Sequence, residues 1–412
     1  MNPSILIIGT VWPEPRSSAA GTRILQLIKL FLEHGYRVHF ASASTPSSNA
    51  FNLREIGVNE IKIKLNDSAF DVFIKDLNPT MVLFDRFMTE EQYGWRVAHC
   101  CPKAVRILDT EDLHFLRKAR EQAFQDNTDV NDSYLFNDVA KREMASIFRC
   151  DLSLIISQFE LSLLKNTFNV DQALLHYLPF FYDASKIDQK ALPQFAERQN
   201  FVSIGNFLHA PNVDAIAYLK EVIWPIIHNR LPEIEMHIYG AYTTNKGLSL
   251  NDPENGFFIK GFASDVNDIM KTARVCLAPL RFGAGLKGKL FDAMLNGTPC
   301  VTTNIGAEGI FEDMEPNGFI ENDNTLIAEK AILLHTNKAL WHKKQQNGFE
   351  VIKQRFASSL FEDEFIIKMK NLVLEIDERR HSNFIGQMLH YHTLQSTKYL
   401  SKWIEEKNKK TT

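Results

Sequence analysis

Residues 280–303 read "LRFGAGLKGKLFDAMLNGTPCVTT" and contain the residue types in this chain that are best suited to binding an anion. Gly283 and Gly285 allow a backbone to approach a ligand closely, and the helix predicted to follow them begins with unpaired N–H groups. Lys287 falls in the first turn of that helix, on its apolar side, which is an unusual place for a solvent-exposed charge. A cation at this position is repelled by the positive end of the helix dipole, and a phosphate bound between the two would stabilise the lysine in its charged form.

A structural explanation of these residues stays open. A lysine at a helix start can lay its stem on apolar surface and keep its ammonium in water. Lys289 and Asp292 both fall opposite the apolar face, and as neighbours three residues apart they could form a surface ion pair worth about 0.2–0.5 kcal/mol. Spacing alone does not decide between an anion site and an ordinary amphipathic helix.

The residues around this stretch predict a parallel sheet on each side of the chain's midpoint. In the first half, apolar segments at 4–10, 37–43, 81–85, 104–110 and 151–157 alternate with amphipathic helices, and the pattern restarts with segments at 199–206, 235–240, 256–262, 275–280 and 299–303. Strands that alternate with helices form βαβ units. The sequence therefore predicts an α/β protein with two tandem Rossmann-like, doubly wound domains, residues 1–190 and 191–370.

The last segment, residues 371–412, is predicted to be helical and has no strand of its own. It carries apolar residues that include Phe384, Met388, Tyr399 and Trp403. Because such a segment cannot form a separate core, we expect this C-terminal extension to pack back on the N-terminal domain.

Composition narrows the range of partners. The 412 residues carry a formal net charge of −4, so a nucleic-acid partner is not indicated. Five cysteines form no CxxC pair, and the acidic segment 126–132 lacks the glycine and final glutamate of a calcium loop, so we expect no metal. No apolar run approaches a membrane span, which leads us to expect a cytoplasmic protein. Four lysines in the last dozen residues are compatible with peripheral contact with the inner membrane surface but do not establish it.

Three separated blocks resemble the retaining glycosyltransferases of the GT-B fold, in particular their fourth sequence family, the glycosyl transferases group 1. The blocks are "FVSIGNFLHAPNVDAIAYL", "GFASDVNDIM" and "APLRFGAGLKGKLFDAMLNGTPCVTTNIGAEGI". The resemblance implies that residues 1–190 bind the acceptor and residues 191–370 bind a nucleotide-sugar donor. Resemblance to a dehydrogenase is weaker, because no GxGxxG follows the first strand.

The resemblance also assigns roles in the donor domain. Asp292 stands where a carboxylate of the family accepts hydrogen bonds from the donor ribose, whereas Ala284 replaces a second family acid near the transferred sugar. The domain-opening glycine, Gly205, lacks the Arg and Lys that often follow it, so Arg281 and Lys287 become the expected catalytic cations for the diphosphate.

Further donor contacts are expected from Gly283, Gly285 and Glu308, and from the N–H of Gly21 in the N-terminal domain. In "DTEDLHFLRKAR", the resemblance places His114 near the transferred sugar as a catalytic residue, and Glu111 and Asp112 are candidates to hold acceptor hydroxyls.

The function implied is transfer of a hexose-like group from a nucleotide sugar to a hydroxyl with retention of configuration. The acceptor would be a glycan or a lipid-linked hydroxyl, in the synthesis of a surface polysaccharide or glycoconjugate. The nucleotide sugar is a co-substrate, and we expect no further cofactor and no metal, since fixed cations can stabilise the leaving diphosphate. Ala284 keeps a second hypothesis open, a catalytically silent nucleotide-sugar-binding or scaffold subunit.

Overall fold

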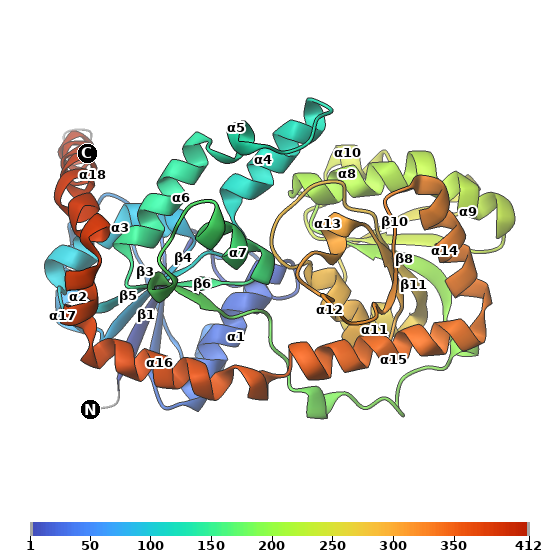
Figure 1. Ribbon diagram of the computed structural model, residues 1–412, viewed down its shortest axis with the longest axis horizontal. Helices are drawn as coiled ribbons and strands as arrows, with labels where there is room; N and C mark the ends of the chain where they lie inside the picture. The colour runs from blue at the N-terminus through green and yellow to red at the C-terminus, as the bar shows by residue number, and fades with distance from the viewer. Residues whose placement is uncertain (1–2, 410–412) are drawn as a thin grey trace.

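The computed structural model describes residues 3–409, with the side chains of residues 392–395 left out of the description. Figure 1 shows two α/β domains side by side, each built on one parallel sheet. The first sheet has seven strands in the order β3-β2-β1-β4-β5-β6-β7, and the second has six in the order β10-β9-β8-β11-β12-β13. Both orders run outward from the first strand of the domain, as in Rossmann-like folds. The predicted fold class is confirmed.

The element bounds are as follows. The strands are β1 (Ser4–Gly9), β2 (Arg37–Ser42), β3 (Asn59–Lys62), β4 (Met81–Asp85), β5 (Val105–Asp109), β6 (Leu152–Ile155), β7 (Leu175–Tyr177), β8 (Gln199–Ile204), β9 (Met236–Tyr239), β10 (Phe257–Gly261), β11 (Ala273–Ala278), β12 (Cys300–Thr302) and β13 (Gly318–Ile320). The α-helices of the first domain are α1 (Ala19–Glu33), α2 (Ala69–Leu77), α3 (Phe87–Cys100), α4 (His114–Gln125), α5 (Asp132–Leu135), α6 (Asp138–Arg149) and α7 (Gln158–Asn166). Those that follow are α8 (Ala210–Tyr218), α9 (Trp224–Arg230), α10 (Asn245–Leu248), α11 (Val266–Thr272), α12 (Gly288–Leu295), α13 (Asn304–Ala307), α14 (Asn324–Thr336), α15 (Lys338–Arg355), α16 (Glu362–Leu374), α17 (Ile376–Ser382) and α18 (Phe384–Lys409).

Strand β1 shows why the sequence forms this kind of sheet. All six of its residues are buried, as expected for a parallel strand with helices on both faces. Ile5 and Ile7 point into one apolar core, which includes α1, while Leu6 and Ile8 point into a second core on the other face. The alternation follows from the two-residue period of a strand.

The two domains are joined by two chain segments that run next to each other. The first leads from β7 to β8, and the second follows α15. They pair at one point, where Tyr182 N donates to Phe356 O and Ser358 N donates to Tyr182 O, both at 2.8 Å. The connection between the domains is therefore double, and its two chains are hydrogen-bonded to each other.

Helix α16 returns the chain to the first domain earlier than predicted. Phe365, Ile366, Met369 and Leu372 are buried in the same core as Ile5 and complete it beside α1. The predicted boundary at residue 370 therefore falls inside a helix of the first domain. The return comes earlier because this helix carries its own apolar face, which the sequence analysis had counted with the second domain.

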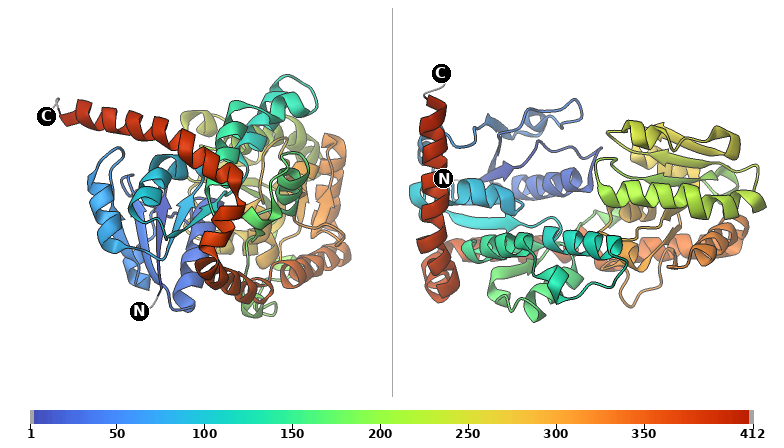
Figure 2. Two further views of the ribbon diagram at one scale, coloured as in Figure 1. Left: turned by 60° about the vertical axis from the view of Figure 1, so that its left-hand side comes forward. Right: turned by 90° about the horizontal axis from the view of Figure 1, so that it is seen from above.

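Helix α18 lies along the outer side of the first domain, at the end far from the second domain (Figure 2). Its contacts are largely polar: Arg96 donates to Ser401 Oγ at 3.1 Å, and Asn383, just before the helix, donates to Phe148 O at 2.8 Å. The prediction that Phe384 and Met388 cover the first domain is wrong, since their exposed fractions are 67% and 44%. Several apolar side chains of this helix are exposed, including Phe384, Ile385, Leu400 and Trp403, while the small or polar residues Gly386 and Ser401 are buried against the first domain.

None of the helices in the described part of the chain has the length and apolar character needed to cross a membrane.

Candidate active site

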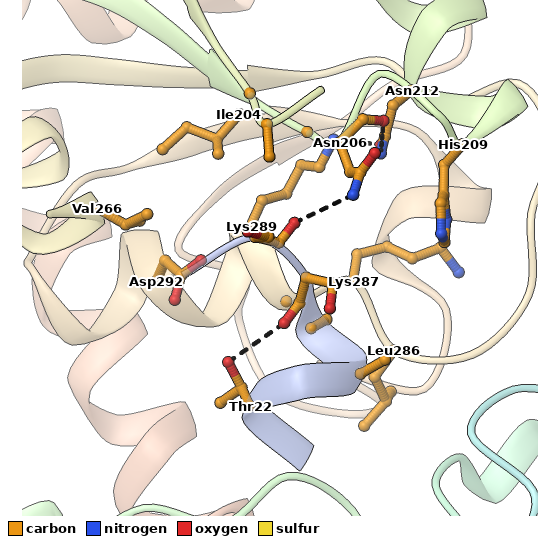
Figure 3. A pocket seen from close by; sticks show the side chains of 18 of the residues that line it. Thr22, Ile204, Asn206, His209, Asn212, Val266, Leu286, Lys287, Lys289 and Asp292 are labelled. Atoms are coloured by element: carbon orange, nitrogen blue, oxygen red, sulfur yellow. Dashed lines mark hydrogen bonds between the residues drawn. The ribbon is translucent and has the colours of Figure 1, made fainter. Parts of the chain in front are cut away.

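A cavity of about 630 Å³ lies between the two domains. Its walls come from loops after β1, β5, β6 and β7 in the first sheet and after β8, β9, β10 and β11 in the second. These loops follow the carboxyl ends of parallel strands, which is where such sheets bind ligands. Figure 3 shows Lys287, Lys289 and Asp292 of the second domain near the start of α1, which carries Thr22.

The first turns of α1 and α12 meet at this cavity. A Cβ placed on Gly288, the first residue of α12, would lie 2.8 Å from the Cβ of Ala19, the first residue of α1. The N–H groups of Ala19 and Ala20 have no acceptor among the residues that the structure describes. Two helix N-termini at such close range concentrate positive potential, and an anion bound between them would be stabilised by both.

Gly21 does not take the role predicted for it. Its N–H donates to Ser18 Oγ at 3.0 Å, which caps α1, and the residue does not line the cavity. A Cβ at this position would lie 2.3 Å from the carbonyl carbon of Glu14, so the glycine allows the loop before α1 to pack onto the helix. The unpaired N–H groups belong to Ala19 and Ala20 instead.

Lys287 is the N-cap residue of α12 and lines the cavity with only 8% of its surface exposed. Its Nζ donates to Gly285 O at 2.6 Å and to Ala284 O at 3.2 Å. Burial lowers the pKa of this ammonium to about 8, although the nearby Glu308 acts in the opposite direction. Because burial disfavours the charged form of this lysine and its recorded hydrogen bonds go only to two carbonyl groups, a bound anion would stabilise its ammonium.

Lys289 is a second cavity lysine, which the sequence analysis did not propose as a phosphate ligand. Its Nζ donates to Asn212 Oδ1 at 2.9 Å, and burial lowers its pKa to about 8. Asp292 lines the same wall, and burial raises the pKa of its carboxyl to about 7 against the influence of Lys289. The sequence placed both residues correctly opposite the apolar face of α12. The polar side of α12 that carries Lys289 and Asp292 borders the cavity between the domains. The two residues are therefore not an ordinary ion pair on the protein surface, which was the alternative left open by the sequence.

Arg281 points away from the cavity. Its Nε donates to Asp214 Oδ2 at 2.8 Å, and its guanidinium lies 4.6 Å from the ring centroids of both Phe124 and Tyr218. The prediction that Arg281 contacts the diphosphate therefore has no support from this geometry. Arg16, in the loop before α1, is a cavity-lining arginine that the sequence analysis did not single out, and it has no ion-pair partner among the described residues.

Asp112, a cavity residue of the first domain, is held by two cationic or potentially cationic groups. Arg117 NH1 donates to its Oδ2 at 2.9 Å, and His114 Nε2 lies 3.4 Å from its Oδ1. Asp112 and Arg117 line the cavity together with His209, whereas His114 lies behind them. Burial lowers the pKa of His114 to about 4, so its ring is neutral near pH 7 and is placed to orient Asp112. No direct contact between His114 and the cavity follows from this arrangement.

Glu111 also lines the cavity, in a strained conformation. Its φ of +65° lies in the left-handed region, and the neighbouring Arg86 has a φ of +70°. Arg86 NH2 lies 3.8 Å from Glu111 Oε2, while Oε1 is buried without a partner in the described structure. Burial raises the pKa of Glu111 to about 8 despite Arg86. Glu111 is thus a cavity-lining residue whose carboxyl group is held in a buried, strained position, with one oxygen unpartnered in the described structure.

The predicted donor-site glycines divide into two groups. Gly205 and Gly283 line the cavity, whereas Gly285 does not. The N–H of Gly285 donates to Glu160 Oε1 at 2.8 Å, and a Cβ on Gly285 would lie 2.7 Å from the Cβ of Asp112. At a φ of +64° and so close to the first domain, only glycine fits this position. Gly285 therefore serves contact between the domains.

Glu308 joins the domains too and does not line the cavity. Arg120 of α4 binds both of its carboxylate oxygens, at 2.9 and 2.7 Å, and donates to Gly283 O at 2.8 Å. The prediction of a donor contact for Glu308 is therefore replaced by a bidentate ion pair across the cleft. This role depends on Arg120, which lies in the other domain, and the spacing of residues along the chain does not show that the two side chains meet.

In the described part of the chain, no group of three or more His, Cys, Asp or Glu side chains is arranged to hold a metal ion.

Two Rossmann-like domains that face each other across a cavity at the carboxyl ends of their strands define the GT-B fold. Residues 198–337, which span most of the second domain, match the family described as "Glycosyl transferases group 1". The chain is thus a GT-B protein that carries a glycosyl transferases group 1 domain. Ala19, Lys287 and Lys289 line its cavity, and we refer to them as the candidate anion-binding wall, or anion-binding wall for short.

Known proteins are similar to this chain in sequence or in fold. An uncharacterized 44.6 kDa protein in the cps region of Klebsiella pneumoniae is 26% identical over 167 residues, which cover 39% of this chain and 43% of that protein. The match thus spans less than half of that relative. A glycosyltransferase from Rickettsia africae superposes with a TM-score of 0.65 at 13% identity and covers 91% of this chain and 99% of its own. HepE from Anabaena, solved with UDP and glucose, superposes with a TM-score of 0.64 at 12% identity, and the match covers 89% of this chain and 99% of HepE.

Proposed function

We propose that the protein transfers a sugar from a nucleotide-sugar donor to a hydroxyl acceptor, with retention of anomeric configuration and without a metal ion. The observation that carries the proposal is the anion-binding wall, where two helix N-termini, Lys287 and Lys289 converge on one cavity. Departure of a nucleoside diphosphate places negative charge there. Preorganised cations and N–H groups stabilise that charge in the transition state, which is the role a metal ion has in other enzymes.

The remaining cavity residues have roles that fit the same reaction. Asp292 is placed further along α12 from the two lysines and would accept hydrogen bonds from the ribose. Asp112 and Glu111, which line the cavity from the first domain, would bind hydroxyls of the sugar or the acceptor. Retention is supported by the resemblance to retaining enzymes, whose acceptor attacks from the face that the diphosphate leaves.

The context of polysaccharide synthesis rests on the similarity to a cps-region protein, and the bound UDP and glucose in HepE support a nucleotide-sugar donor. We propose a glycan or a lipid-linked hydroxyl as acceptor, in the cytoplasm. With a net charge of −4, the chain is not expected to bind nucleic acid.

A panel of nucleotide sugars tests the proposal. Thermal stabilisation would identify the donor, since a ligand at 100 times its Kd adds about 2.7 kcal/mol. Transfer to glycan acceptors, or slow hydrolysis of the donor, would then be followed by NMR, which also reports the anomeric configuration of the product. Donor binding without transfer or hydrolysis would instead favour a silent nucleotide-sugar-binding subunit. An inverted product would refute retention.

A matched pair of variants connects the activity to the proposed wall. Lys289→Ala removes a cavity cation and should lower kcat by about 10²–10³-fold, the loss typical of one preorganised charge stabiliser. Arg281→Ala removes a cation of the loop before α12 that is paired with Asp214 outside the cavity, and should leave kcat within about threefold. Equal losses in both variants would contradict the assignment of the wall.

We also propose that α18 rests on an anionic membrane surface. Its exposed side chains include Tyr399 (63%) and Trp403 (60%), two residue types that favour the membrane interface, and the helix carries four lysines and two glutamates. The Tyr399→Ser/Trp403→Ser double variant should bind less to vesicles of phosphatidylcholine and phosphatidylglycerol. Leu248→Ser, which changes an apolar side chain of the second domain that is 53% exposed, should leave vesicle binding unchanged. Equal sedimentation of all three proteins would refute the contact.

A further inference from the structure

The loop that carries Lys287 is held by residues of the other domain. Arg120 of α4 donates to Gly283 O at 2.8 Å, and Glu160 of α7 accepts the N–H of Gly285 at 2.8 Å. Two main-chain groups within three residues of the loop are thus bound from across the cleft. No residue of the loop's own domain is recorded as binding either group in the described structure.

Glu160 is an unusual residue for such a contact. It is fully buried, and its Oε1 also accepts the N–H of Leu113 at 3.1 Å, at the start of α4. Its Oε2 has no partner among the described residues, and neither has the neighbouring Ser157 Oγ. Burial of a carboxylate costs free energy unless hydrogen bonds replace the lost hydration. Inside the first domain, Glu160 has one such bond in the described structure, from the N–H of Leu113. The second bond exists only when the two domains are together.

Gly285 connects Glu160 to the lysine. The N–H of this residue points to Glu160, and its carbonyl accepts the hydrogen bond from Lys287 Nζ at 2.6 Å. A shift of Gly285 therefore moves an anchor of the ammonium that faces the cavity. Arg120 and Glu308 fix the same loop from its other end, but they leave Gly285 unbound.

We infer that Glu160 is a positioning residue for the proposed transfer reaction: by holding Gly285 across the cleft, it sets the place of Lys287 at the leaving diphosphate. The inference rests on the proposed function. A misplacement of about 1 Å at a reacting site can cost about 10²-fold in rate. The residue itself lies outside the cavity and needs no contact with either substrate.

The test compares Glu160→Ala with Glu160→Gln. Alanine removes the acceptor for Gly285 and should lower kcat by about 10–100-fold, while the Kd of the donor's nucleoside diphosphate, measured by calorimetry, changes by less than about threefold. Glutamine keeps an acceptor oxygen in the same place and should restore kcat to within about threefold of the wild type. Glu143→Ala is the matched control, since Glu143 is a buried carboxylate that binds two N–H groups wholly inside the first domain. It should lower thermal stability without a comparable loss of kcat.

Hydrogen exchange provides a readout that does not depend on activity. In the full-length protein, a peptide covering residues 280–290 should exchange faster in Glu160→Ala than in the wild type, and at the wild-type rate in Glu160→Gln. An alanine variant with kcat within threefold of the wild type, or with unchanged exchange in this peptide, would overturn the inference. A wild-type protein that neither transfers nor hydrolyses its donor would refute the proposed function instead, and the exchange measurement would still decide the role of Glu160.

Discussion

Raising the pH from 7 to 9 should weaken binding of a nucleoside diphosphate by about 100-fold. Burial lowers the pKa of both Lys287 and Lys289 to about 8 in the free protein. A bound anion favours the charged lysine and raises its pKa, so the affinity is fully present below pH 8 and is lost as the pH rises above it. In the free protein each lysine passes from about 90% protonated at pH 7 to about 10% at pH 9, so each contributes a loss of up to about tenfold when the bound anion raises its pKa well above 9. The diphosphate itself completes its ionisation near pH 6, so its charge is constant over this range.

Calorimetric titration of the diphosphate at constant ionic strength, in half-unit steps of pH, measures this dependence. Lys289→Arg keeps its charge to high pH and should reduce the loss of affinity to about tenfold. Arg281→Ala should keep the full 100-fold change, because Arg281 is paired with Asp214 outside the cavity. A Kd that varies by less than about threefold between pH 7 and 9 would show that neither lysine contacts the phosphates.

Three further predictions follow from the geometry. Asp292→Asn should raise the donor KM and leave kcat nearly unchanged in steady-state kinetics, because bonds to the ribose lie far from the breaking bond; a loss confined to kcat would contradict this. Phe365→Ala should lower the free energy of unfolding by about 3–5 kcal/mol in urea titrations, because the ring is fully buried and packs edge-on against Phe31 at 5.8 Å; a change below 1 kcal/mol would show that α16 does not belong to the core of the first domain. Gly285→Ala should abolish transfer while leaving a folded protein by circular dichroism, because its Cβ would collide with Asp112 across the cleft; full activity would show that this close approach is not needed.

The regular pattern of the sequence was sufficient to predict the fold. Every strand longer than four residues was anticipated, because buried parallel strands read as continuous apolar runs. The strands missed were β3, β7 and β13, which have three or four residues and lie at or near the ends of the two sheets. Such short strands depend on pairing with a neighbour more than on their own composition.

The site was predicted less completely, and the reason lies in the contacts between the domains. Lys287, Gly205, Gly283, Asp112, Glu111 and Asp292 all line the cavity, as the motif and the resemblance suggested. Arg281 carries the charge expected at a diphosphate site, and Glu308 is a carboxylate expected to contact the donor, but partners from elsewhere in the fold hold both side chains away from the cavity. Lys289 was assigned to a polar face, and the sequence does not tell whether a polar face borders water or a cleft.

The return of α16 to the first domain affects how this chain is made. During synthesis, the first sheet is complete once β7 has emerged, yet one face of its core awaits Phe365, Met369 and Leu372, nearly 190 residues later in the chain. At ribosomal rates of about 5–20 residues per second, that face stays open for roughly 10–40 s while the whole second domain is translated. The nascent first domain is therefore the stage at which this protein is most exposed to aggregation and most dependent on chaperones.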